Sequence, residues 1–162
     1  MSDARPNILD NPRIMALLPD RSDKNVALSS RICADRSRIF YAISIPEYIE
    51  AWLQFPPQEG LRFVFDPIAE QAFRITLYRA EASVRSIHAN CDIRDSSQIR
   101  YTWKTRYATG ITNTLVDIKL LSVSGGCAVA LNHSGFQDAA DTAWHAKVWQ
   151  LSLENLCRLM EK

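Results

Sequence analysis

Apolar residues recur at helical spacing over one long segment, residues 138–161, which contains neither proline nor glycine. The pattern predicts an amphipathic helix, and about 23 residues of helix extend about 35 Å, enough to cross a whole sheet. Asp138 is a suitable N-cap, and Asp141 three positions later resembles the second member of a capping box. The apolar face consists of Trp149, Leu153, Leu156 and Met160. Such a helix either closes a ligand pocket or packs on a sheet as part of the core.

Upstream of this helix, apolar and polar residues alternate with a period of two, which predicts strands. The predicted strands cover residues 26–33, 62–65, 73–78, 84–93, 99–104, 111–123 and 127–133. Asp66-Pro67 should end the second of these strands. Ser124-Gly125-Gly126 predicts a hairpin turn between the last two.

Two short helices are predicted after the first strand. Asp35 caps a helix that runs to Ile43, and Pro46 opens a second helix over residues 46–55. The element order lacks β-α-β alternation, so it predicts an α+β fold with an antiparallel sheet that has one covered face. If the sheet curves strongly around the long helix, a ligand would bind in the gap between them.

Composition narrows the function classes. A chain of 162 residues predicts one domain, and a net charge of +1 gives no electrostatic case for binding nucleic acid or an anionic membrane. No apolar run is long enough to span a bilayer, and the N-terminus lacks the apolar core of a signal peptide, so we expect a cytoplasmic protein. Residues 1–24 read as a mobile tail with one short docking turn, and residues 25–162 as the folded domain.

The four cysteines give no sign of a metal site or a redox pair. They show no C-x-x-C spacing and no nearby histidine in a zinc-like pattern, so we expect buried thiols. No Gly-rich phosphate loop, Walker motif, G-x-S-x-G or H-E-x-x-H is present, and we expect no cofactor and no metal.

Three segments resemble the Hsp90-ATPase-activator-homologue branch of the START/Bet v 1-like (SRPBCC) superfamily: IRYTWK at 99–104, TNTLVDIKLLSVSGGCAVALNHSGF at 112–136, and the helix that contains Trp149. FYAISIPEYIEAWL at 40–53 is similar to the helix pair of that family, so the resemblance covers about residues 26–161. The chain departs from the family pattern at residues 66–71, where a glycine pair is common, and at Ser96-Ser97, where a proline is usual.

The resemblance implies a helix-grip fold, in which a curved antiparallel sheet wraps around the long C-terminal helix and two short helices close one end. Members of the superfamily include small-molecule carriers, polyketide cyclases and co-chaperones, so function must be argued from the site. In such a fold, the inward face of the sheet and the facing side of the helix would line a pocket. The candidate ligand-binding residues are Trp52, Phe73, Ile75, Tyr101, Trp103, Ile118, Leu120, His133, Trp149 and Leu153. They suit an apolar or aromatic ligand, or alternatively they meet one another and fill the core.

Few polar residues are candidates for a functional site. His133 either faces the pocket mouth or fixes the turn into the long helix, and it cannot form a catalytic pair with Ser134 because adjacent strand residues point to opposite faces. His88 and His145 have no acid at an orienting spacing. The arginines of the strand region are Arg74, Arg79, Arg85, Arg100 and Arg106. Most should lie on a solvated outer face, and one turned inward would indicate an anionic ligand head group.

Three functions remain in order of preference. The first is a module that binds a hydrophobic small molecule without covalent chemistry. The second is an interaction protein or chaperone regulator, which predicts a filled core and an exposed apolar patch. The third is a cyclase-like enzyme, which needs an inward arginine, histidine or carboxylate with a perturbed pKa. A homodimer is compatible with each of these three functions, but the sequence does not indicate which residues would form the dimer interface.

Overall fold

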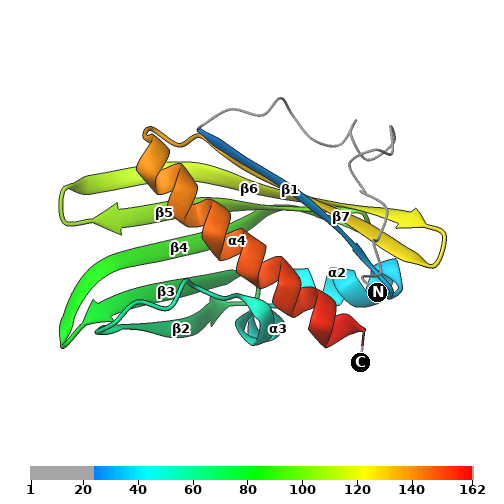
Figure 1. The fold of residues 1–162 in the computed structure, drawn as a ribbon, viewed down its shortest axis with the longest axis horizontal. Coiled ribbons are helices and arrows are strands. Elements are labelled where there is room, and N and C mark those ends of the chain that lie inside the picture. Colours follow the sequence, from blue (N-terminus) through cyan, green and yellow to red (C-terminus); the bar gives the residue numbers. More distant parts are fainter. Residues whose placement is uncertain (1–23, 162) are drawn as a thin grey trace, which may run out of the picture.

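Seven strands form one curved antiparallel sheet in the order β1-β7-β6-β5-β4-β3-β2 (Figure 1). The computed structural model describes residues 24–161. The strands are β1 (Asn25–Ile32), β2 (Leu61–Ala69), β3 (Ala72–Arg79), β4 (Ala82–Asp95), β5 (Gln98–Tyr107), β6 (Gly110–Val123) and β7 (Gly126–Ser134). Each strand after β2 pairs with the one before it, and β1 joins the far edge beside β7. The predicted antiparallel sheet is therefore confirmed, with β1 and β2 as its edges.

Three helices accompany the sheet in the described part of the chain. α2 (Arg36–Ser44) and α3 (Pro46–Trp52) follow β1, and α4 (Ala139–Met160) follows β7. α4 crosses the concave face diagonally from the β5–β6 end to α2 and α3 (Figure 1). Its backbone comes closest to β1 and α3. This is the helix-grip arrangement that the sequence predicts. The predicted N-terminal tail lies outside the described residues, apart from Lys24.

The N-terminus of α4 begins where the sequence predicts. The carboxylate of Asp138 accepts a hydrogen bond from the backbone N–H of Asp141 at 2.7 Å, which satisfies one of the unpaired donors of the first turn. The predicted apolar face, Trp149, Leu153, Leu156 and Met160, is buried. The carboxylate of Asp141 does not complete a capping box, because it bonds to side chains described below.

The C-terminal end of α2 is held by two of the predicted ligand-binding residues. The indole N–H of Trp52 donates to the carbonyl of Ala42 at 2.8 Å, and the hydroxyl of Tyr101 donates to the carbonyl of Ile43 at 2.7 Å. Carbonyls in the last turn of a helix have no partner within the helix, so these bonds satisfy otherwise unpaired acceptors. Trp52 and Tyr101 therefore anchor α2 to α3 and to the sheet.

Two predicted boundaries are wrong. β2 continues through Asp66-Pro67, because β2 is an edge strand, where a residue without an N–H is tolerated. The second helix ends at Trp52 instead of residue 55. Beyond it the chain is extended, and the N–H of Gln54 donates to Ser152 of α4 at 2.9 Å instead of continuing the helix.

Candidate functional site

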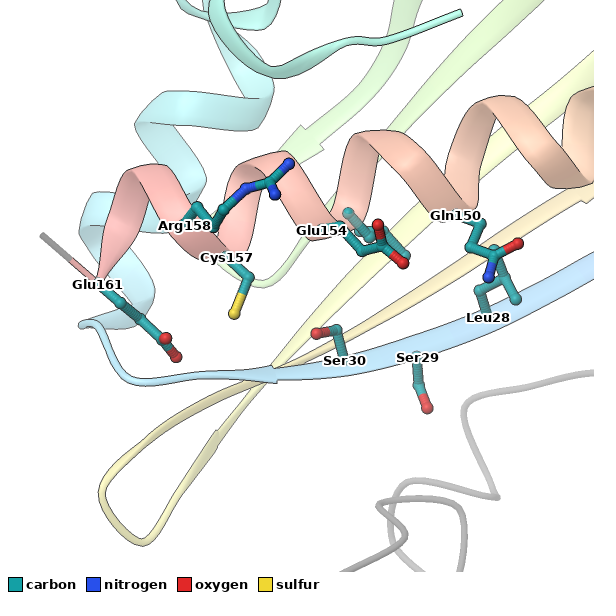
Figure 2. A pocket seen from close by; sticks show the side chains of 9 residues that line it. Leu28, Ser29, Ser30, Gln150, Glu154, Cys157, Arg158 and Glu161 are labelled. Carbon is teal, nitrogen blue, oxygen red and sulfur yellow. The ribbon is translucent and has the colours of Figure 1, made fainter. Parts of the chain in front are cut away.

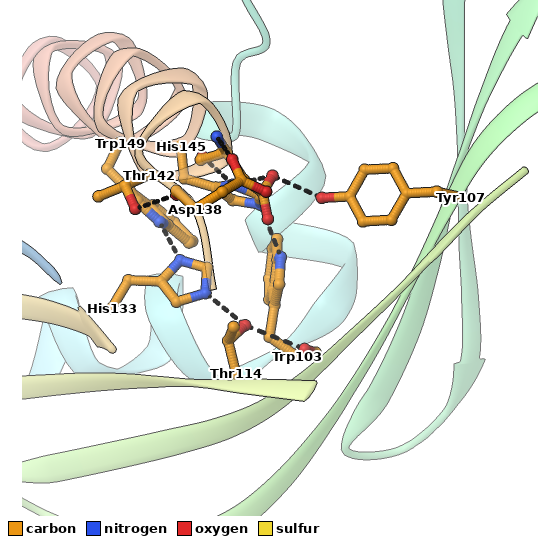
Figure 3. A network of polar contacts seen from close by, with 9 residues as sticks. Trp103, Tyr107, Thr114, His133, Asp138, Thr142, His145 and Trp149 are labelled. Atoms are coloured by element: carbon orange, nitrogen blue, oxygen red, sulfur yellow. Dashed lines mark hydrogen bonds and ion pairs between the residues drawn. The ribbon is translucent and has the colours of Figure 1, made fainter. Parts of the chain in front are cut away.

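A chain of hydrogen bonds crosses the buried layer between the sheet and α4 (Figure 3). The indole N–H of Trp149 donates to Nδ1 of His133 at 2.9 Å. Because an indole N–H can only donate, Nδ1 is the acceptor and the neutral ring carries its proton on Nε2. Nε2 lies 2.7 Å from the Thr114 hydroxyl, which donates in turn to the carbonyl of Trp103 at 3.0 Å. Both nitrogens of the fully buried His133 ring are thus satisfied.

A second set of bonds leads from this layer toward the surface. The indole N–H of Trp103 donates to Nε2 of His145 at 3.2 Å, so the other ring nitrogen carries the proton. That nitrogen, Nδ1, lies 2.9 Å from the carbonyl oxygen of Asp141 and 3.3 Å from its carboxylate Oδ1. The same Oδ1 accepts a hydrogen bond from the hydroxyl of Tyr107. The His133 and His145 rings lie edge to face, with their centroids 4.8 Å apart.

Burial and hydrogen bonds set the protonation states of these groups. Burial, assisted by the charge of His145, lowers the pKa of His133 well below 6.5. Burial raises the pKa of Tyr107, and its hydrogen bond to Asp141 adds to that effect. Burial alone would raise the pKa of Asp141, but the bonds from His145 and Tyr107 and the charge of Arg85 outweigh it and lower the pKa. At neutral pH the Asp141 carboxylate is therefore ionised, while Tyr107 and His133 are neutral.

A pocket of about 520 Å³ opens at the outer end of this network, between the first turns of α4 and the ends of β4, β5 and β6. Its walls include Arg85, Tyr107, Thr112, Ala140, Asp141 and Trp144. Arg85 lies opposite Tyr107 in the β4–β5 pairing and two positions before the buried Ile87, so its side chain faces α4. The pocket therefore lies at the rim of the gap between sheet and helix.

The guanidinium of Arg85 is stacked between two aromatic rings in this pocket. Its central carbon lies 4.2 Å from the ring centre of Trp144 and 4.7 Å from that of Tyr107. Within residues 24–161, the buried Nη1 of Arg85 has no hydrogen-bond partner. This guanidinium nitrogen thus retains unused hydrogen-bonding capacity.

The ten residues proposed from sequence are all buried. They are Trp52, Phe73, Ile75, Tyr101, Trp103, Ile118, Leu120, His133, Trp149 and Leu153. The aromatic members pack on one another, with Trp103 5.3 Å from Trp149 and Phe73 5.5 Å from Tyr101 between ring centres. None of the ten lines the Arg85 pocket. His133 lies in the core and bonds α4, not at a pocket mouth and not within the turn.

One of the ten, Leu153, borders a second hollow of about 500 Å³ between the edge strand β1 and the C-terminal half of α4. Ser30 of β1 points toward α4 there, and Ser29 points away from it (Figure 2). Glu154 and Arg158 of α4 also line this hollow. Its walls carry charged side chains, so it does not match the predicted apolar pocket.

Of the residues that form the rim pocket, the sequence indicated only Arg85, as one of five strand arginines of which one turned inward would indicate an anionic ligand head group. Tyr107, Asp141 and Trp144 were not predicted. The statement that no acid orients His145 is wrong, because Asp141 lies four residues earlier on the same helix face. That spacing is readable in the sequence. The inward direction of Arg85 follows the period of two that it shares with Ile87 and Ala89, but the sequence did not show which arginine of the strand region would turn inward.

The remaining chemistry-bearing groups form no further centre. No disulfide joins the four cysteines, and burial raises the pKa of the Cys91 and Cys127 thiols. Cys33 is exposed, so the expectation of buried thiols is wrong for that residue. No group of histidine, cysteine and acidic residues within 24–161 has the arrangement of a metal site. None of the described helices is long and apolar enough to cross a membrane.

Comparison with known proteins identifies the family to which this fold belongs. A family model described as "Activator of Hsp90 ATPase homolog 1-like protein" matches residues 34–161. The chain belongs to this family. The expected membership in the Hsp90-ATPase-activator-homologue branch of the START/Bet v 1-like superfamily is thus confirmed. No curated protein matches the sequence significantly.

Several solved structures share the fold. A protein from Chromobacterium violaceum is 21% identical, with 87% of this chain and 99% of that chain covered and a TM-score of 0.69. The AHSA1 protein of Silicibacter pomeroyi is 14% identical, with 83% and 96% covered and a TM-score of 0.66. The Aha1 dimer of Colwellia psychrerythraea is 14% identical, with 85% and 96% covered and a TM-score of 0.57. At these identities the comparison establishes the fold and leaves the function to the site.

Proposed function

We propose that this protein binds a small molecule at the rim of the gap between the sheet and α4. The observation that carries the proposal is the pocket of about 520 Å³ in which Arg85, Tyr107 and Trp144 converge. Its volume lies in the range of small-molecule sites, and it combines aromatic walls with a few polar groups. The fold family often binds hydrophobic ligands, which supports the same conclusion. We also propose a cytoplasmic location for the protein, as expected from the sequence.

The ten sequence-predicted residues enter the proposal as part of the buried core, which adjoins the pocket at Trp103. Trp103 connects the two regions, because its indole bonds His145 and His145 contacts Asp141 at the pocket wall. A packed apolar layer excludes water behind the ligand and lowers the local dielectric constant, which strengthens polar contacts made at the rim. A ligand that reaches deeper than the rim would contact these residues.

Binding is favoured over catalysis by the state of the polar groups. Asp141 has a perturbed pKa and faces the pocket, as an enzyme would require. Its pKa is lowered, however, and its Oδ1 already accepts from Tyr107 and lies close to the protonated nitrogen of His145. A carboxylate in that state is a weak general base, and a phenol with a raised pKa is a weak acid.

The test is a thermal-shift screen against fatty acids, sterols, flavonoids and polyketide-like aromatics. A ligand at 100 times its Kd adds about 2.7 kcal/mol of stability, which raises the Tm of a domain this size by roughly 5–10 °C. Hits are then titrated into ¹⁵N-labelled protein, where the indole N–H of Trp144 should shift before those of the three buried tryptophans. The absence of any stabilising ligand, or shifts confined to residues far from Trp144, would reject the site.

A second candidate function, interaction with another copy of this chain, is favoured by a separate surface. A hollow of about 370 Å³ lies between α2, α3 and the end of α4, bordered by Tyr41 and Tyr48, whose side chains are 58% and 53% exposed. Exposed tyrosines beside Ala51 and Leu159 are typical of interface cores. The Colwellia psychrerythraea relative is described as a dimer. Light scattering over a concentration series should show a dimer that Tyr48→Glu dissociates, and a monomer at every concentration would reject this candidate.

A further inference from the structure

The charge of Arg85 is only partly balanced by its surroundings. Its positive charge lowers the pKa of Asp141, so the two groups interact, yet within residues 24–161 Arg85 forms no ion pair within 4.0 Å. The Oδ1 of Asp141 accepts from Tyr107 and faces His145. Asp138, the other acid at the pocket, is exposed and caps α4. Arg85 is therefore a half-buried cation whose nearest carboxylates bond to other groups.

The aromatic rings beside Arg85 limit where a ligand group can bind it. The ring centres of Trp144 and Tyr107 lie 4.2 Å and 4.7 Å from the guanidinium carbon, at the distance of cation–π partners. The N–H groups of a guanidinium lie in its plane and point outward from its edge, so a ligand acceptor binds at that edge. A planar carboxylate matches this edge with two parallel hydrogen bonds. The Thr112 side chain also lines this pocket, next to Tyr107.

We propose, as an extension of the proposed binding function, that the ligand of this pocket is a monocarboxylate with an apolar body. Arg85 binds the carboxylate, and the side chains of Trp144 and Ala140 contact the apolar body. One negative charge balances the guanidinium. A dianionic phosphate would place excess negative charge beside Asp141, and a cationic ligand would be repelled by Arg85.

The experiment compares acids with their neutral methyl esters on the same bodies. Benzoate, trans-cinnamate and octanoate, each with its methyl ester, are titrated into ¹⁵N-labelled protein while the Trp144 indole signal is followed. Charge-assisted hydrogen bonds predict that at least one acid binds about 10- to 100-fold more tightly than its ester. Arg85→Met should remove this preference. Arg106→Met is the matched control, because Arg106 adjoins Tyr107 in β5 but lies exposed on the opposite face.

The outcomes separate this inference from the proposal on which it rests. Esters that bind as tightly as their acids, or an acid preference that persists in Arg85→Met, would overturn the carboxylate assignment and leave small-molecule binding intact. If no acid or ester moves the Trp144 signal, the carboxylate assignment is overturned, and a negative thermal-shift screen would overturn the proposed function as well. The comparison of acid and ester on the unaltered protein decides the question even if Arg85→Met does not fold.

Discussion

His133 should make the stability of this protein fall as the pH drops below about 6.5. The ring is fully buried, and burial holds its pKa well below 6.5 in the folded state. Once unfolded, the ring titrates with the ordinary pKa, so below pH 6.5 the unfolded state binds one more proton than the folded state. Stability is then complete above pH 6.5 and is lost as the pH falls toward the folded-state pKa.

The size of the effect follows from proton linkage. Each pH unit between the unfolded and the folded pKa costs about 1.36 kcal/mol per group, so His133 should remove up to about 2 kcal/mol between pH 7 and pH 5. That is a large part of a typical free energy of unfolding. Asp141 also has a lowered pKa, but its reference value of 3.8 places its own loss of stability mostly below this window.

Urea denaturation at pH 7, 6, 5.5 and 5 measures the loss. His133→Gln retains one acceptor for Trp149 and one donor for Thr114 but does not titrate, so its stability should fall by about 2 kcal/mol less over the same range. A ¹⁵N spectrum of the wild-type imidazole at pH 5 should still show Nδ1 without a proton. Equal losses in the two proteins, or a doubly protonated ring in the folded state at pH 5, would refute the reasoning.

Three further predictions concern groups of the same network. Trp149→Phe leaves the buried Nδ1 of His133 without its donor and should cost about 1–3 kcal/mol in urea denaturation, so an unchanged midpoint would contradict the assigned bond. Asp138→Ala removes the cap of α4 and should cost about 1 kcal/mol, whereas Asp138→Asn should retain most of the stability, and equal losses would argue against capping. Burial raises the pKa of Tyr101 and Tyr107, so both should form phenolate at a higher pH than free tyrosine in an absorbance titration. Tyr107→Phe should remove part of the absorbance change that occurs above the pKa of free tyrosine. Loss of absorbance change at or below that pKa would contradict the raised pKa of Tyr107.

The architecture could be predicted because its signals are local. The apolar face of α4, the alternation in β5 and β6 and the glycine hairpin before β7 all lie in short stretches of sequence, and each element formed near its expected position. The passage of β2 through Pro67 could not be read in this way. A proline is tolerated there only because β2 is at the edge of the sheet, which depends on the order of all seven strands.

The rim pocket could not be predicted from the sequence for a related reason. Arg85, Tyr107 and Trp144 come from three elements, and they meet only through the register of β4 with β5 and the docking of α4. The choice of partners for Asp141 likewise depends on Trp103, which takes one nitrogen of His145 and so directs the other toward Asp141. Periodicity identifies buried faces, but it does not show which polar groups at their margins will meet.

The position of α4 along the chain has a consequence during synthesis. β7 ends at Ser134 and α4 begins at Ala139, so the ribosome completes the whole sheet before it makes the helix that covers the concave face. In that interval Trp103, Phe73 and the other aromatic residues of the inner layer have no cover. Uncovered apolar surface of this kind invites aggregation and chaperone binding in nascent chains. Until α4 docks, its apolar face is therefore the missing partner of this hydrophobic surface.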